Sequence, residues 1–189
     1  MLAMSEPAKK RATYEDLLAV PDHKVAEILN GELVVHPRPA SLHARAASIL
    51  GIELGGPFDL GRNGPGGWII LDEPELHLGK DVLVPDLAGW LRTRMPELPD
   101  APAFALPPDW ACEVLSPSTE ASDRADKLPI YAREQVKHVW FIDPRTRTLE
   151  VMRLDGTTFR VVATWRDEAK PRAEPFEALE LELAILWKL

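Results

Sequence analysis

Two short apolar runs, each containing a single acidic residue, constrain this chain more than any other feature of it. Asp86 lies in the run Val82-Leu83-Val84-Pro85-Asp86-Leu87, and Glu113 lies in the run Trp110-Ala111-Cys112-Glu113-Val114-Leu115. Apolar runs of this length predict buried strands. A buried carboxylate is costly unless a cation, a proton or a lysine accompanies it. The chain must therefore fold around two acids in or beside its core, and Lys127 is the nearest candidate for their partner.

The order of strand, helix and strand around Glu113 predicts a β-α-β unit. The helix begins near residue 119 or 122 and runs to about 134, with an irregular turn at Pro129. The almost wholly apolar run 138–142 follows it and predicts a central strand buried on both faces. Strands joined by a helix in this way pair in parallel, which favours a mixed sheet.

The predicted helix places three polar side chains on one face, because Asp123, Lys127 and Tyr131 are spaced four residues apart. If the strands of Asp86 and Glu113 lie side by side, both carboxylates point to one place. Hard oxygen ligands with open water positions suit Mg²⁺ or Mn²⁺, and such an ion polarises a phosphate and activates the attacking water. A lysine on the adjoining helix then orients that water or neutralises the developing negative charge.

Hairpins are predicted near both ends of the chain. Asn30-Gly31 separates two apolar runs, 25–29 and 32–35, and this dipeptide favours a type I′ turn. Alternation puts Glu27 on the same face as two aliphatic residues, so it is a third acid in an apolar setting. The second predicted hairpin consists of 149–154, the turn Asp155-Gly156 and 159–162.

Length and composition predict one domain. The 189 residues, of which 46% are hydrophobic, suffice for one well-buried core and are too few for two comfortable domains. We expect a flexible segment over 1–12 and a single domain over 13–189. The expected fold class is α/β, with a mixed β-sheet core flanked by helices. One of these helices covers 42–54, is capped by Ser41, ends at Gly55-Gly56-Pro57 and carries His43 in its first turn.

Charge and cysteine content argue against several classes of protein. The formal net charge of -8 disfavours a protein that simply coats DNA, although basic residues can still gather on one face. The single cysteine, Cys112, cannot form an internal disulfide. No apolar run approaches the roughly 20 residues that cross a bilayer, and the first residues are polar. We expect a soluble cytoplasmic protein without membrane contact.

The acids and the lysine also have roles that involve no chemistry. Asp86 follows a proline and is placed to cap a turn. Lys127 is placed to pair with Asp123 on a solvated helix surface. Glu27 faces solvent instead of the core if the hairpin register is shifted by one residue.

The remaining polar candidates also have more than one role open to them. His43 is either a substrate or metal contact or an exposed imidazole in a first helical turn. Ser118 is expected to be a cap rather than a nucleophile, because no His/Asp arrangement lies near it in the sequence. Tyr131 fits the core as well as a supporting role in the site. The tryptophans are spread along the chain and are expected to pack in the core.

The order of these residues resembles the Uma-type family of restriction-endonuclease-like proteins in the PD-(D/E)XK nuclease superfamily. The resemblance covers about Tyr14 to Arg160. It is carried by Gly31-Glu32-Leu33, His43, Pro85-Asp86-Leu87, the string Glu113-Val114-Leu115-Ser116-Pro117-Ser118-Thr119, Asp123, Lys127, Tyr131 and Trp140 through Asp143-Pro144. It implies a restriction-endonuclease-like core in which Asp86 and Glu113 match the metal-binding acids. The family's usual lysine two places after the second acid is replaced by Leu115, so Lys127 would have to take its place.

Two functions of different class follow from these observations. The first is a Mg²⁺- or Mn²⁺-dependent endonuclease that hydrolyses DNA phosphodiester bonds, works as a homodimer and binds phosphates through a rim of Arg38, Arg45, Arg124 and Arg133. The second is an inactive nuclease-like module that binds a protein partner or itself, which the missing lysine and the acidic balance favour. A glycosidase with paired carboxylates is a weaker third hypothesis, because Lys127 has no role in that scheme.

Overall fold

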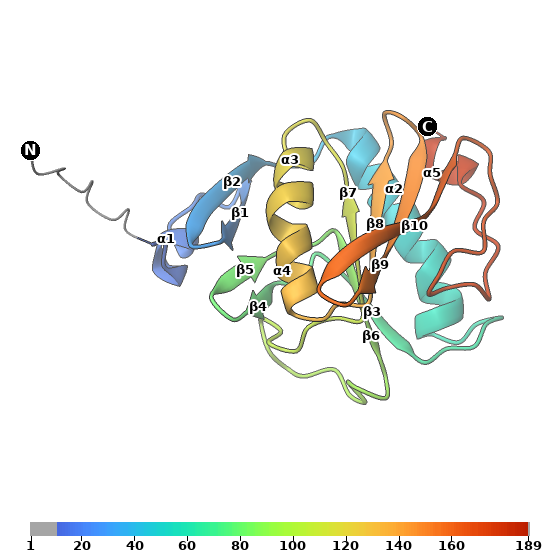
Figure 1. Cartoon of the computed structure of the whole chain (residues 1–189), viewed down its shortest axis with the longest axis horizontal. Coiled ribbons are helices and arrows are strands. Elements are labelled where there is room, and N and C mark those ends of the chain that lie inside the picture. The colour runs from blue at the N-terminus through green and yellow to red at the C-terminus, as the bar shows by residue number, and fades with distance from the viewer. Residues whose placement is uncertain (1–10, 189) are drawn as a thin grey trace, which may run out of the picture.

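The computed structural model describes residues 11–188, which form two β-sheets and a few helices (Figure 1). The predicted flexible segment 1–12 therefore lies almost entirely outside the described residues. The smaller sheet contains, in spatial order, β2 (Glu32–Pro37), β1 (Lys24–Leu29), β5 (Asp81–Leu83) and β4 (Leu76–Leu78). The larger sheet contains β10 (Thr158–Arg166), β9 (Thr148–Asp155), β8 (His138–Asp143), β7 (Trp110–Val114), β6 (Leu87–Leu91) and β3 (Trp68–Asp72). The helical elements are α1 (Tyr14–Leu18), α2 (Ser41–Leu54), η1 (Gly55–Asp59), α3 (Glu120–Ser122), η2 (Asp123–Lys127), α4 (Leu128–Arg133) and α5 (Ala184–Trp187).

The β-α-β unit forms as predicted. β7 and β8 pair in parallel, and every other neighbouring pair in the six-stranded sheet is antiparallel. β6 lies beside β7, with Leu87 opposite Cys112, so the segments that carry Asp86 and Glu113 are neighbours. The mixed α/β class is therefore confirmed.

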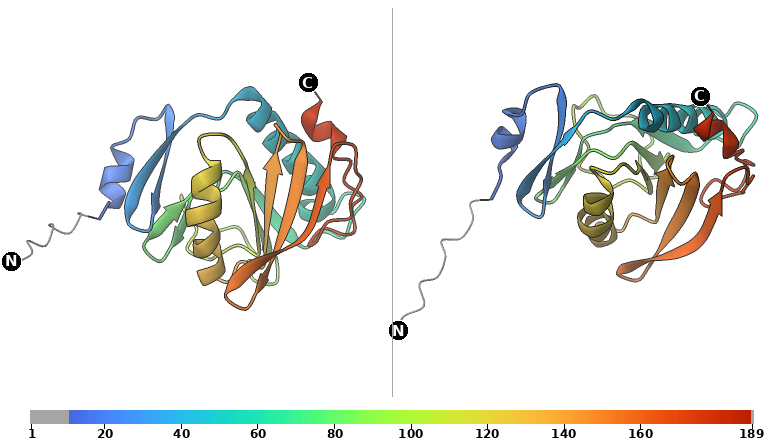
Figure 2. Two further views of the ribbon diagram at one scale, coloured as in Figure 1. Left: turned by 45° about the horizontal axis from the view of Figure 1, so that its top comes forward. Right: turned by 90° about the horizontal axis from the view of Figure 1, so that it is seen from above.

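The six-stranded sheet has helices on both faces, as the view from above shows (Figure 2, right). Side chains alternate along β7, so Trp110, Cys112 and Val114 pack in the same cluster as α2. Glu113 points to the opposite face, toward the helical residues 120–133. This alternation is what aims one acid of a buried strand at a lysine on the helix.

Both predicted hairpins are present, but they belong to different sheets. Asn30 (φ 56°) and Gly31 (φ 85°) both have positive φ, as a type I′ turn between β1 and β2 requires. That hairpin joins the small sheet with β4 and β5, whereas the β9–β10 hairpin extends the large one. The expectation of one core sheet with appended hairpins is therefore corrected to two separate sheets.

The prediction of a single strand around Asp86 is wrong, because the chain passes from one sheet to the other within it. β5 ends and β6 begins on either side of Val84-Pro85-Asp86. Val84 donates its backbone N–H to Oε1 of Glu27 instead of to a neighbouring strand, and Pro85 has no N–H to donate. Asp86 consequently lies at the junction between the two sheets.

Three details of the helices also differ from the prediction. Ser41 does not cap α2 but is its first residue, and the N-cap, Ala40, makes no side-chain hydrogen bond. The elements α3, η2 and α4 form one helical segment, 120–133, whose irregular turn precedes Pro129: the N–H of Leu128 donates to the carbonyl of Asp123, five residues back. Because Pro129 has no N–H, it is tolerated in the first turn of α4, directly after this wide turn. The stop expected at 55–57 does not end α2, which continues as the wide turn η1. None of the helices in residues 11–188 is long and apolar enough to cross a membrane.

Candidate active site

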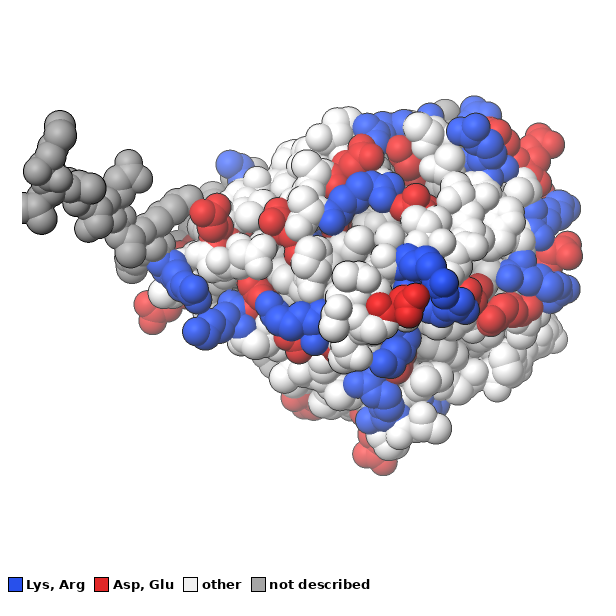
Figure 3. Space-filling view, in the orientation of Figure 1, with Lys and Arg blue, Asp and Glu red and all other residues white. Residues whose placement is uncertain are grey.

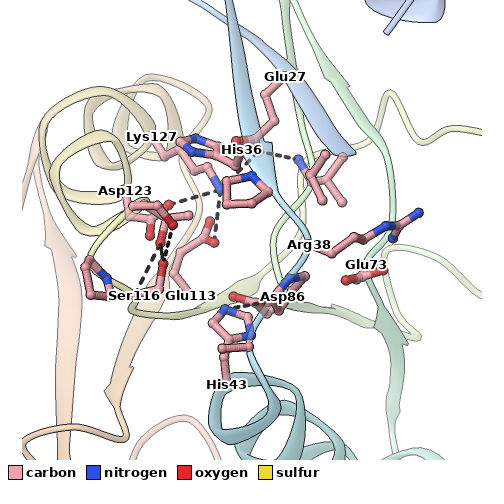
Figure 4. A pocket seen from close by; sticks show the side chains of 18 residues that line it. Glu27, His36, Arg38, His43, Glu73, Asp86, Glu113, Ser116, Asp123 and Lys127 are labelled. Carbon is pink, nitrogen blue, oxygen red and sulfur yellow. Dashed lines mark hydrogen bonds and ion pairs between the residues drawn. The ribbon is translucent and has the colours of Figure 1, made fainter. Parts of the chain in front are cut away.

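A pocket of about 190 Å³ lies between the two sheets, where the β5–β6 junction meets the end of β7 and the start of the helical segment 120–133. Its charged side chains come from both sheets and from the helices. Figure 4 shows Glu113 and Asp123 pointing toward Lys127, whereas Arg38 points away from this group. The predicted site residues that line it are Glu27, His43, Asp86, Glu113, Ser118, Asp123 and Lys127. Tyr131 is not part of the lining, but its hydroxyl contacts Glu113.

Lys127 is buried and is surrounded by three carboxylates. Its Nζ lies 3.0 Å from Oε1 of Glu27, 3.1 Å from Oε2 of Glu113 and 3.1 Å from Oδ1 of Asp123. The Glu113 contact is also a hydrogen bond, whereas Oδ1 of Asp123 has an ion pair but no hydrogen bond of good geometry. Burial lowers the pKa of Lys127, but the three carboxylates outweigh it and hold that pKa well above its usual value. Lys127 is therefore an ammonium ion at neutral pH, not the solvated helix residue of the alternative interpretation.

Glu113 is held at both carboxylate oxygens. Tyr131 donates its hydroxyl to Oε1 at 2.6 Å, and Lys127 donates to Oε2 at 3.1 Å. Burial raises the pKa of Glu113, Lys127 lowers it, and the negative charges of Asp123, Asp86 and Glu27 raise it further. The net direction is well upward, because one ammonium does not compensate burial and several neighbouring acids.

Asp86 is held from two sides. Its Oδ2 accepts the backbone N–H of Val114 at 2.7 Å, and its Oδ1 lies 3.3 Å from Nε2 of His43. Burial lowers the pKa of His43, but the hydrogen bond and the charge of Asp86 outweigh burial, so that pKa is raised. Nδ1 of His43 is buried without a hydrogen-bond partner in the described part of the chain. His43 is therefore a buried contact of Asp86 and not an exposed imidazole.

Glu27 ties the two sheets together. Its Oε1 accepts the backbone N–H of Val84 at 2.8 Å and also pairs with Lys127. Because Val84 is two residues before Asp86, this one carboxylate holds both the junction that carries Asp86 and the helix that carries Lys127. The solvent-facing alternative for Glu27 is wrong, since the side chain is 1% exposed.

The hydroxyl groups after Glu113 do not cap the following helix in the predicted way. Thr119 is the residue before α3, but its side chain makes no capping hydrogen bond. Instead, Oγ of Ser116 lies 3.0 Å from Oγ of Ser118 and 3.1 Å from Oγ1 of Thr119. The loop therefore presents a cluster of hydroxyls to the pocket.

Two titratable lining residues are not predicted from the sequence. His36 lies beside the helical segment, with Nε2 3.5 Å from Oγ of Ser122. The alternation along β2, in which Val34 and His36 are half-buried and Val35 is exposed, would have revealed it. Glu73 lines the rim with a positive φ of 44°, and no pattern in the sequence points to it.

Of the four predicted rim arginines, the pocket includes one. Arg38 lines the pocket and donates from Nη2 to the carbonyl of Asp22 at 2.7 Å (Figure 4). Arg124 pairs with Glu120 and Glu150 instead. The other two, Arg45 and Arg133, do not line it.

The donor chemistry of the pocket fits a hard divalent cation. Asp86 and Glu113 present carboxylate oxygens to the same pocket, and an oxygen that accepts one hydrogen bond keeps a second lone pair. Across residues 11–188, no three His, Cys, Asp or Glu side chains are grouped so that they alone hold a metal ion. An ion held by these two acids would therefore complete its coordination with water, as Mg²⁺ commonly does.

Comparison with known proteins places the chain. The model of the Uma2 family, described as "Putative restriction endonuclease", matches residues 11–185. The crystal structure of "a putative nuclease belonging to DUF820" from Anabaena variabilis has the same fold: the TM-score is 0.74 at 21% sequence identity, and the match covers 93% of this chain and 97% of that chain. None of the curated proteins matches. Since the family model spans nearly all of the described residues, the chain belongs to the Uma2 family.

Proposed function

We propose that this chain is a metal-dependent endonuclease with a restriction-endonuclease-like core, which hydrolyses phosphodiester bonds in DNA. The observation that carries the proposal is the position of Lys127, whose Nζ lies 3.1 Å from Glu113 although Leu115 occupies the family's usual lysine position. The helical segment thus supplies the cation that the strand lacks. Family membership and the shared fold support the same reaction class.

In this proposal Asp86 and Glu113 hold Mg²⁺ or Mn²⁺. When bound, the ion supplies Lewis-acid polarisation of the phosphate and a water of lowered pKa. His43 fixes one oxygen of Asp86, and Tyr131 fixes one oxygen of Glu113, so both acids are oriented before substrate arrives. Glu27 holds the two sides of the pocket at a constant separation.

Lys127 acts through its charge. Because its pKa is raised, it stays protonated at neutral pH and cannot serve as a general base. With its three N–H groups directed at acids, it is placed to offset negative charge that develops on the phosphate. Its three carboxylate partners hold the ammonium in one position.

Arg38 is the proposed phosphate contact within the pocket. The pocket lining contains two Lys or Arg side chains, and Lys127 is already engaged by three acids. Arg38 is exposed and uses one of its five N–H groups on the carbonyl of Asp22, so the others are available to an anion. We accordingly assign the substrate phosphate to the Arg38 side of the pocket.

An inactive interaction module remains the second candidate. Its supporting observation is that both oxygens of Glu113 already have donors, from Tyr131 and Lys127, which gives a closed network. A network of this kind stabilises the junction of the sheets whether or not catalysis occurs. Self-association does not separate the candidates, because a homodimer is also the expected form of an enzyme that reaches both DNA strands.

The first experiment is a cleavage assay on linear, supercoiled and single-stranded DNA with Mg²⁺ or Mn²⁺. The wild type is compared with Glu113→Gln and with Glu97→Gln, which removes an exposed acid in the same protein. We expect cleavage that needs metal, persists in Glu97→Gln and falls at least about 100-fold in Glu113→Gln. Cleavage that survives in Glu113→Gln would mean that a contaminant or another site is responsible.

Metal binding distinguishes the two candidates if no DNA is cut. We expect Mn²⁺ to raise the melting temperature of the wild type and to have a much smaller effect on Asp86→Asn, because a cation that binds only the folded state stabilises it. Equal responses of the two proteins would remove Asp86 from the proposed metal site and favour the interaction module.

A further inference from the structure

A second pocket, of about 360 Å³, lies on the small sheet beyond the active-site pocket. It is formed by the β1–β2 turn, the β4–β5 turn and the end of α4, and its seven lining residues include three cations. The lining consists of Arg11, Asn30, Gly31, Gly79, Lys80, Asp81 and Arg133. The pocket thus unites basic residues from three separate segments of the chain.

Asp81 organises this pocket without neutralising all of its positive charge. Its carboxylate is buried, accepts the backbone N–H of Asn30 at 2.6 Å through Oδ1 and pairs with Nη2 of Arg133 at 2.9 Å through Oδ2. Nε of Arg133 also donates to Glu134 at 2.8 Å. Arg133 is therefore fixed in place and its charge is compensated by two acids.

Arg11 and Lys80 carry the uncompensated charge. Both side chains are exposed, and within residues 11–188 no ion pair joins either of them to an acid. Figure 3 shows Lys and Arg side chains on this side of the molecule, near the β4–β5 turn and the end of α4, with Asp and Glu side chains beside them. In a chain of net charge -8, this pocket is a local positive region.

We infer that this pocket binds a backbone phosphate of the DNA strand whose scissile bond lies in the active-site pocket. The inference rests on the proposed function, because it names a surface that the same substrate contacts. Guanidinium and ammonium groups are the usual phosphate contacts of DNA-binding proteins, and such contacts set the register of the strand without reading its sequence.

The position of the pocket suits this role. Lys127 lines the first pocket and Arg133 the second, and both lie on one helical segment, where six residues correspond to roughly 9 Å along the helix axis. Between the two pockets, Nδ2 of Asn30 donates a hydrogen bond to Oδ1 of Asp126, which joins the β1–β2 turn to the helical segment. A DNA strand that leaves the first pocket therefore passes over this hydrogen bond on its way to the second pocket. An offset of roughly 9 Å corresponds to about three nucleotide steps along one strand of B-form DNA.

The test is equilibrium binding of labelled single-stranded and duplex DNA, measured by fluorescence anisotropy over a range of salt concentrations. EDTA is present, so that no metal-dependent cleavage occurs and the outcome is independent of the cleavage assay. The variants are Arg11→Gln and Lys80→Gln. Lys170→Gln is the control. Lys170 lies on the C-terminal segment, is 53% exposed and pairs with Glu182, and the substitution removes one positive charge outside the pocket.

We expect each pocket variant to weaken binding to all sequences alike and to reduce the slope of log K against log salt by about one, while the control matches the wild type. An unchanged slope and affinity in both pocket variants would overturn the inference, and so would a wild type that binds no DNA at any salt concentration. Salt-dependent binding that is lost in Lys80→Gln would support it even if the wild type cuts no DNA. In that case the proposed catalysis would be wrong, while the proposed phosphate-binding pocket would still be supported.

Discussion

The Nζ atom of Lys127 lies 3.0 Å from Oε1 of Glu27, and this buried ion pair joins the helical segment on the large sheet to the first strand of the small sheet. The same Glu27 oxygen accepts the N–H of Val84, next to the segment that carries Asp86. The two sheets thus meet through charged groups at the pocket. The stability of this junction and the geometry of the candidate site depend on the same few side chains.

Lys127→Met is expected to destabilise the protein strongly. Methionine has a similar length but no charge, so Glu27, Glu113 and Asp123 would be left buried without their cation. Removing one partner of a buried ion pair typically costs about 3–5 kcal/mol. The free energy of unfolding from urea titration measures the effect, with the exposed Lys170→Met as the control. A loss below about 1 kcal/mol would mean that the three carboxylates do not depend on Lys127.

Tyr131→Phe and Tyr14→Phe form a matched pair. Both tyrosines donate to a glutamate Oε1, at 2.6 Å for Tyr131 and 2.7 Å for Tyr14, but the first bond is buried and the second is exposed. We expect Tyr131→Phe to lower the free energy of unfolding by about 1.5–3 kcal/mol, because Glu113 loses a donor that water cannot replace. Tyr14→Phe should cost less than about 1 kcal/mol. Equal losses would argue that burial of Glu113 does not strengthen its hydrogen bond.

The parts of the fold that the sequence predicts are those with local signals. Asn30-Gly31 fixes a type I′ hairpin within a few residues, and the apolar run 138–142 marks a central strand. The division into two sheets has no such signal, since it depends on β1 pairing with β5, which is far away in the sequence. Pro85 indicates that the hydrogen bonds between strands are interrupted there. The group that accepts the N–H of Val84 instead, Glu27, is a tertiary contact and has no local signal.

The candidate site likewise has parts that the sequence predicts and parts that it does not. The four-residue spacing of Asp123, Lys127 and Tyr131 predicts a shared face, and the structure brings all three to Glu113 or its partner Lys127. The spacing does not predict that Glu27 completes the group, because its approach depends on how the small sheet packs. The sequence predicts that His43 is either a substrate or metal contact or an exposed imidazole, whereas its actual partner, Asp86, follows from the packing of α2 on the sheet.

His43→Gln is expected to have a larger effect at low pH than at high pH. Because the folded-state pKa of His43 is raised, its pairing with Asp86 adds stability that is fully present below the unfolded value, about 6.5, and is lost as the pH rises through the folded value. The free energy of unfolding of wild type and variant should therefore differ more at pH 5.5 than at pH 9. His23→Gln, on the exposed α1–β1 connection, is the control. A difference that is constant with pH would mean that His43 is uncharged in its contact with Asp86.

Glu113→Gln is expected to show a pH dependence of the same sign, beginning at lower pH. The folded-state pKa of Glu113 is raised above its unfolded value of about 4.3, so the folded protein favours the neutral acid. The stability that the neutral form contributes is fully present below that unfolded value and is lost as the pH rises through the folded value. Glutamine stays neutral throughout, so the variant avoids this loss.

The free energy of unfolding of Glu113→Gln, measured in EDTA, should therefore rise relative to that of the wild type from pH 4 to pH 7, by at most about 1.4 kcal/mol per pH unit. A relative stability that stays flat or falls over this range would show that Lys127 and Tyr131 keep Glu113 ionised at little cost. A rise in relative stability combined with loss of cleavage would separate the effect of Glu113 on stability from its role in the reaction. An ionised Glu113 would then lower the stability of the fold while the proposed reaction requires it, as is common for groups retained for chemistry.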